Sequence, residues 1–169
     1  YPQYQSAQSN DDLNAYGVRD GGWYAITMMC ENPSDVAERA TLAGYFDNPE
    51  DQPDYEPVTK DVRVRKAISM ALNRQELQDR ATFGVNEAND NLGASTMPWV
   101  WQDDNTGSQL RDEPAQIQDQ ERAEELLEEA GYTGDPRLEI EMLCKTAEER
   151  VAVVAQEQLS QIGVDVTLD

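Results

Sequence analysis

The side chains that most often carry out covalent chemistry are scarce in this sequence. The 169 residues contain no histidine, which excludes Ser-His-Asp and Cys-His nucleophiles and every His-ligated metal site. No glycine-rich phosphate loop is present either, since neither a Walker-type loop nor GxGxxG occurs. We therefore predict no catalytic residue, no metal and no cofactor, and we expect that the protein is not an enzyme.

The two cysteines, Cys30 and Cys144, form neither a CxxC pair nor a metal quartet. Three interpretations stay open: two small buried side chains on strands, one disulfide, or a reactive thiol. The apolar neighbours of both residues favour buried side chains on strands.

An aromatic segment offers the best candidates for noncovalent binding. It reads Met97-Pro98-Trp99-Val100-Trp101 and lies within residues 83–118, which show no periodicity. Tryptophan has a flat apolar face and one N–H donor, which suits contact with a ligand as well as packing on a core. Met97, Trp99 and Trp101, together with Trp23, are our candidate ligand-binding residues. The alternative is that the segment packs locally.

Basic residues gather at one place, where Lys60, Arg63, Arg65 and Lys66 occupy the start of a predicted helix. Cations there oppose the helix dipole and therefore need partners. One interpretation is ion pairing with the acidic residues 31–57, and the other is a docking point for an anionic group or a partner protein. Asp61 is the expected N-cap of this helix.

The charge of the chain limits its partners. There are 34 acidic and 13 basic residues, for a net charge of −21, which repels nucleic acid and anionic membranes. Disorder is one interpretation of such a composition, but the periodic apolar residues favour a folded, salt-adapted protein. No signal peptide is visible, and the chain opens on Tyr1 rather than Met. We therefore expect an excised or processed piece of a longer protein from a halophile.

The elements that must position these residues follow from the apolar patterns. The first half predicts a polar lead-in or linker over 1–22, a buried strand over 23–30, an acidic surface insert over 31–57 with a short helix over 34–44, and helices over 61–73 and 74–82. The second half predicts a helix over 119–130, a strand over 137–144, a helix opened by a capping box at Thr146 and stopped at Gly163, and a strand over 164–168. Strand, helix and strand in this order form a βαβ unit, whose strands should be parallel.

Three segments together resemble a known family. They are Asp61-Val-Arg-Val-Arg-Lys-Ala-Ile-Ser-Met-Ala-Leu-Asn-Arg74, the stretch 122–132 ending in Glu-Ala-Gly-Tyr, and the stretch 155–166 containing Ile-Gly-Val-Asp-Val. In order and spacing they are similar to the extracellular solute-binding proteins, family 5, of peptide, dipeptide and nickel ABC transporters.

The resemblance implies an α/β fold: part of a type II periplasmic-binding-protein-like two-lobe structure, with a small, mostly parallel sheet and flanking helices. Residues 23–169 would be part of the C-terminal lobe, with 31–57 inserted and the other lobe missing. The parent would capture peptides or related solutes outside the cell or at its surface, with or without a lipid anchor at its N-terminus, and deliver them to a membrane permease. Arg63 and Arg65 would be ion-pair anchors beside Asp61.

Two other classes remain as alternatives. The chain could be a stand-alone acidic interaction or structural domain of a salt-adapted organism, with residues 31–57 as its binding surface. An enzyme would have only Asp and Glu chemistry to use, as glycosidases do.

Overall fold

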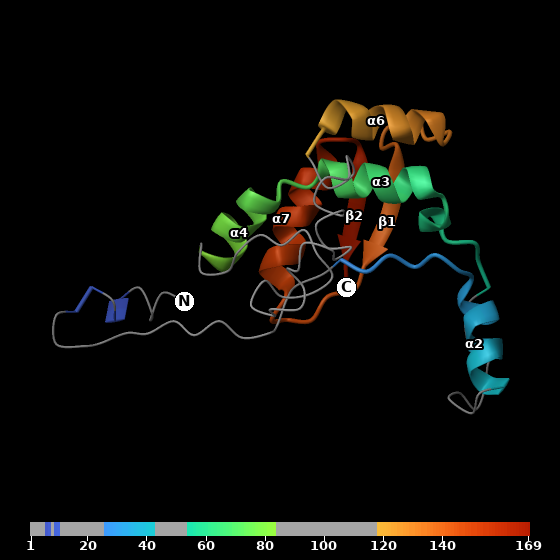
Figure 1. The fold of residues 1–169 in the computed structure, drawn as a ribbon, viewed down its shortest axis with the longest axis horizontal. Coiled ribbons are helices and arrows are strands. Elements are labelled where there is room, and N and C mark those ends of the chain that lie inside the picture. Colours follow the sequence, from blue (N-terminus) through green and yellow to red (C-terminus); the bar gives the residue numbers. More distant parts are fainter. Residues whose placement is uncertain (1–5, 8, 11–25, 43–53, 84–117) are drawn as a thin grey trace, which may run out of the picture.

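The computed structural model describes residues 6–7, 9–10, 26–42, 54–83 and 118–169 (Figure 1). Its elements, in chain order, are α2 (Pro33–Leu42), the 3-10 turn η2 (Val58–Lys60), α3 (Val62–Ala71), α4 (Arg74–Thr82), α6 (Gln120–Glu129), β1 (Leu138–Met142), α7 (Glu149–Ser160) and β2 (Val164–Leu168). All five helices expected within these ranges are confirmed. No helix among the described residues is both long enough and apolar enough to span a bilayer. The lead-in 1–22 lies mostly outside the described residues and stays a prediction.

The two strands pair in parallel, with Leu138 opposite Val164 and Ile140 opposite Val166. Because α7 connects them, the predicted βαβ unit is confirmed. Leu138, Val164 and Val166 are buried, whereas the intervening residues, of which Glu139 is one, are exposed. One face of the pair therefore supports the core, and the other face is in contact with solvent.

The core forms where the helices lay their apolar stripes on that face of the strands. Helices α3 and α6 pack side by side along much of their length, as Figure 1 shows at the top of the molecule. Residues of this apolar cluster with at most 2% exposure come from the three core helices, from β2 and from the turn between α7 and β2: Val64, Ala67, Ile68, Ala71, Ala123, Leu127, Ala155, Leu159, Ile162, Val164 and Val166. Burial of a Leu or Ile side chain contributes roughly 1.5–3 kcal/mol, so this shared cluster is the main source of stability.

Side chains and glycines mark most helix ends where the sequence indicates them. The Asp61 carboxylate accepts a hydrogen bond from the Arg63 N–H at the start of α3. Asp119 accepts one from the Arg122 N–H at the start of α6. Gly131, with φ +97°, follows the end of α6 in the left-handed conformation that glycine adopts at low cost.

The capping box at Thr146 is wrong. Helix α7 begins at Glu149 with Glu148 as its N-cap, and no side chain caps it. Residues 146–148 form a turn instead, in which the Glu148 N–H donates to the Lys145 carbonyl over 2.7 Å. The turn takes up the residues that the predicted first helical turn would have needed, so α7 is shorter than expected.

The buried strand over 23–30 is wrong for its described part. Residues 26–30 alternate between half-buried and exposed, with Ile26 and Met28 packed on the core, but they belong to no strand. An apolar run indicates which side chains are buried, but it does not show whether a neighbouring strand is present to form backbone hydrogen bonds with it. Cys30 is exposed and Cys144 lies beyond the end of β1, and both thiols are free. Neither buried cysteines on strands nor a disulfide is therefore observed.

We predict that Leu127→Ala lowers the free energy of unfolding by about 2–5 kcal/mol, because Leu127 is fully buried and the truncation leaves a cavity. Chemical denaturation in concentrated salt measures the change. Leu143→Ala is the matched control, since Leu143 is 76% exposed, and it should change the value by less than about 0.5 kcal/mol. Equal losses in both variants would contradict the assignment of the core.

Candidate functional site at the carboxyl edge of the strands

The carboxyl ends of β1 and β2 lie at the same edge because the strands are parallel. The backbone continues the pairing beyond both strands: the Asp169 N–H donates to the Met142 carbonyl over 3.1 Å, and the Cys144 N–H donates to the Asp169 carbonyl over 2.8 Å. In open α/β sheets, ligands bind outside the carboxyl ends of parallel strands. This edge is therefore the first place to look for a site.

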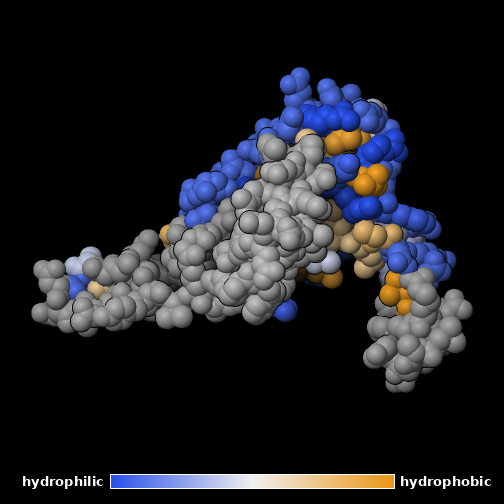
Figure 2. All heavy atoms as spheres, viewed as in Figure 1, coloured by the Kyte–Doolittle hydropathy of each residue, from blue (hydrophilic) through white to orange (hydrophobic). Residues whose placement is uncertain are grey.

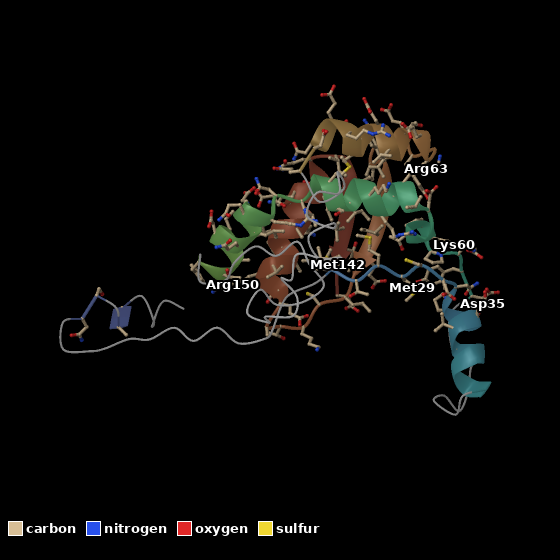
Figure 3. The ribbon with its side chains drawn as sticks, viewed as in Figure 1. Met29, Asp35, Lys60, Arg63, Met142 and Arg150 are labelled. Carbon is tan, nitrogen blue, oxygen red and sulfur yellow. The ribbon has the colours of Figure 1, made fainter. Side chains whose placement is uncertain are left out.

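In the view of Figure 1, the segment Ile26–Cys30 passes across the arrowhead ends of both strands. Its side chains at 26 and 28 pack against the core, while Met29 is 49% exposed. The Thr59 hydroxyl donates to the Met29 carbonyl, and the Tyr55 hydroxyl lies 3.6 Å from the Met29 sulfur. Figure 3 shows Met29 on this segment and Met142 at the end of β1.

The exposed side chains near this edge are mostly apolar. Met29 and Tyr55, which contact each other, and Leu143, the residue after β1, are each about half or more exposed, and thioether side chains adjust to ligands of different shape. Among the described residues no group of three or more Cys, Asp or Glu side chains could hold a metal ion. Noncovalent contact with a solute is the chemistry that these side chains support best.

The four aromatic and methionine candidates from the sequence cannot be placed here. Trp23, Met97, Trp99 and Trp101 all lie outside the described residues, so their role stays a prediction. The sequence reasoning missed Met29 and Tyr55. The sequence held only part of the information needed to find them. The alternation of Ile26 and Met28 shows that Met29 faces the other way, but the contact of Met29 with Tyr55 joins residues 26 positions apart.

Arg63 ties α3 to α6. Its guanidinium pairs with Asp61 at 2.5 Å and donates to the Glu129 carbonyl at the end of α6 over 2.5 Å. The hydrogen bond from the Arg63 side chain, helped by the Arg63 backbone N–H, lowers the pKa of Asp61 to about 2. The carboxylate beside it and the carbonyl end of α6 together offset the unfavourable place of this cation in the first turn of α3.

Two other members of the basic cluster, Lys60 and Arg65, also have partners. Lys60 pairs with Glu56 at 2.5 Å, as the ion-pair interpretation predicted for the acidic segment. Arg65 donates to the carbonyls of Thr59 and Lys60, both at 2.8 Å, so these contacts are to backbone rather than the ion pair expected of it. An open hollow of about 410 Å³ lies beside this cluster and is lined by Glu56, Pro57, Val58, Lys60, Asp61 and Tyr132. Its charged side chains pair with one another or with Arg63, which leaves little for a charged ligand.

Arginines bridge pairs of glutamates across the outer helices. Arg80 pairs with Glu76 and Glu157, and Arg122 pairs with Glu125 and Glu129. Arg137 pairs likewise with Glu124 and Glu128. Hydrogen bonds to the glutamates raise the pKa of Arg80, Arg122 and Arg137. The outer surfaces of α4 and α6, to which most of these glutamates belong, are hydrophilic in Figure 2. Each exposed pair contributes little to stability, but together the pairs reduce local repulsion.

The comparisons with known proteins agree with this arrangement. Residues 1–169 match the family model described as bacterial extracellular solute-binding proteins, family 5 Middle. The chain belongs to this family. It is 32% identical over 123 residues to the nickel-binding periplasmic protein of Escherichia coli K12, a match that covers 65% of this chain and 22% of that protein.

Solved structures share part of the fold. The oligopeptide-binding protein AppA of Bacillus subtilis, in complex with a nonapeptide, matches with 25% identity and a TM-score of 0.51 over 66% of this chain and 23% of that chain. The binding protein AgaA of Agrobacterium tumefaciens R10, in complex with agropinic acid, matches with 23% identity and a TM-score of 0.52 over 66% and 22%. The α/β, type II periplasmic-binding-protein-like fold is thereby confirmed. This chain spans roughly a fifth of the length of these relatives.

We predict that Asp61→Asn weakens the protein at neutral pH and that the difference from wild type disappears on acidification. The folded-state pKa of about 2 lies below the ordinary value of 3.8. The Asp61 contribution is therefore fully present above pH 3.8 and is lost as pH falls toward 2. Asparagine still caps the helix, so the variant isolates the charge. Urea denaturation across this pH range measures the difference.

Asp79→Asn is the control, because the Asp79 carboxylate accepts a hydrogen bond from the neutral Gln75 side chain. A difference between Asp61→Asn and wild type that stays constant down to pH 2 would contradict the assigned pKa.

We predict that salt stabilises the chain. At a net charge of −21, long-range repulsion opposes folding, and about 1 M salt shortens the Debye length to ~3 Å. The same salt weakens the exposed arginine bridges, but these contribute little. The thermal midpoint should therefore rise by several degrees between dilute buffer and molar KCl. A falling midpoint would show that the bridges outweigh the repulsion.

Proposed function

We propose that this chain is part of the solute-binding component of an ABC transporter, which captures peptides or related solutes outside the cell for uptake. The observation that carries the proposal is the family match over residues 1–169. The relatives that it resembles include a nickel-binding protein and proteins in complex with a nonapeptide and with agropinic acid. Their roles are binding rather than conversion, which supports our expectation that this protein is not an enzyme.

The described geometry suits one wall of a binding cleft. The carboxyl edge of β1 and β2, with the exposed Met29 and Tyr55 beside it, offers adaptable apolar contacts and backbone groups. Such a wall holds a ligand without breaking a bond in it. Binding sites cover most of a ligand's surface, so a second wall is needed, and we propose that the remaining lobe of a longer parent chain supplies it. Closing the two walls on the solute would couple affinity to the closed population.

Peptides are the solute class that we propose first. A peptide presents varied side chains, which thioether and phenol surfaces accommodate without a fixed shape. We further propose that a membrane permease receives the solute and that the protein works outside the cell or at its surface, held there through the N-terminus of the parent by a lipid anchor. The family and its periplasmic relative support this location. The acidic surface would keep the protein soluble in concentrated salt.

Calorimetric titration tests the proposal. A panel of nonapeptides, agropinic acid and Ni²⁺ is titrated into the 169-residue chain and into the longer polypeptide of the same reading frame. We predict that the longer polypeptide binds a panel member at micromolar affinity or tighter. The 169-residue chain alone should bind no tighter than millimolar, because half of the ligand stays in water.

Each negative outcome has its own meaning. Micromolar binding by the 169-residue chain would show that one wall is enough. If the longer polypeptide binds no panel member, the proposal is overturned. The alternative, a stand-alone acidic interaction domain, is then favoured. Loss of a protein partner on deletion of residues 31–57 would then identify the interaction surface.

A further inference from the structure

One asparagine side chain joins two segments that are far apart in the sequence. The Asn32 amide nitrogen donates to the Asp54 carboxylate over 2.7 Å. The Asn32 amide oxygen accepts from the Ser34 N–H at 3.1 Å, the Ser34 hydroxyl at 3.0 Å and the Tyr55 N–H at 3.3 Å. We call these four residues the Asn32 clasp. A single side chain thus uses both its donor and its acceptor to close a 22-residue stretch of chain.

The same two segments meet again at Met29. There the Thr59 hydroxyl donates to the Met29 carbonyl, and the Tyr55 hydroxyl approaches the Met29 sulfur. Figure 3 shows Met29, Lys60 and Asp35 close to the point where α2 joins the rest of the protein. The stretch 29–32 is therefore fastened along 54–59.

The segment Ile26–Cys30 is held from two sides. At one end Ile26 and Met28 pack on the core, and at the other end the clasp begins two residues after Cys30. Residues 26–30 form no strand. Packing on the core and the clasp therefore hold this segment in place of the backbone hydrogen bonds that a neighbouring strand would supply. Helix α2 points away from the two strands in Figure 1, and Asn32 directly precedes its first residue, Pro33.

We propose that Asn32 is a positioning residue, which holds the segment Ile26–Cys30 in place across the carboxyl edge. The importance of that edge for a solute rests on the proposed function, but the positioning itself does not.

The chemistry of the clasp allows an exchange of partners. Asn32→Asp places two carboxylates where the structure has a 2.7 Å amide–carboxylate hydrogen bond, so the clasp should open. Adding Asp54→Asn restores one amide and one carboxylate with their places exchanged. The carboxylate at 32 can still accept from Ser34 and Tyr55.

Hydrogen exchange of the whole 169-residue chain, without ligand, tests the proposal. The Tyr55 amide and the amides of 27–30 should exchange about tenfold faster in Asn32→Asp, the size expected when a hydrogen bond to a charged group is lost. The double variant Asn32→Asp/Asp54→Asn should return close to wild type. Asn73→Asp adds the same charge at the N-cap of α4, a position that accepts Asp equally well, and should leave these amides unchanged.

Two outcomes would overturn the proposal. In one, Asn32→Asp exchanges like wild type; in the other, the double variant stays as fast as the single one. If Asn32→Asp fails to fold, recovery in the double variant decides the question alone. Because exchange is measured without ligand, failure here leaves the titration result standing, and failure of the titration leaves the clasp standing.

Discussion

Two parallel strands cannot be joined by a tight turn, and the rest of this structure depends on that constraint. The chain must leave β1, cross one face of the pair and return to start β2 at the same end. Helix α7 makes this crossing, and Leu159 and Ala155 on its inner side are fully buried. Once α7 covers one face, α3 and α6 extend the same cluster, and both strands end together at the edge where a solute could be received.

The parts that could be predicted from the sequence are those in which local pattern and burial agree. Val64, Ala67 and Ile68 recur at helical spacing and are buried in α3, and Asp119 and Gly131 mark the ends of α6. Contacts between distant residues leave no such pattern. Gln158 is only 1% exposed, and its burial is possible because it hydrogen-bonds the Asn73 backbone and the Glu76 carboxylate. In the sequence it is one more polar residue beside an apolar stripe.

The same reasoning explains what the sequence could not give about the candidate site. The apolar run 23–30 correctly indicates that Ile26 and Met28 pack on the core. Whether the run forms a strand depends on a second strand beside it, which the local sequence does not indicate. Arg65 lies among other cations, a pattern that predicts carboxylate partners, whereas its guanidinium donates to the backbone carbonyls of Thr59 and Lys60 in η2. A resemblance carried by α3, α6 and the βαβ unit identifies the family through its scaffold, because scaffold residues are the ones that recur with a regular period.

Scaffold and site therefore obey different rules in this chain. The core is built from periodic apolar residues whose partners are set by helix and strand geometry, and it tolerates an acidic exterior because arginines bridge the glutamates above it. The edge is held by single polar contacts between distant segments, such as Asn32 with Asp54. Polar contacts of this kind stabilise little but are directional. The solute-binding wall that we propose would need directional contacts more than stability, and the Asn32 clasp beside the βαβ unit provides such contacts.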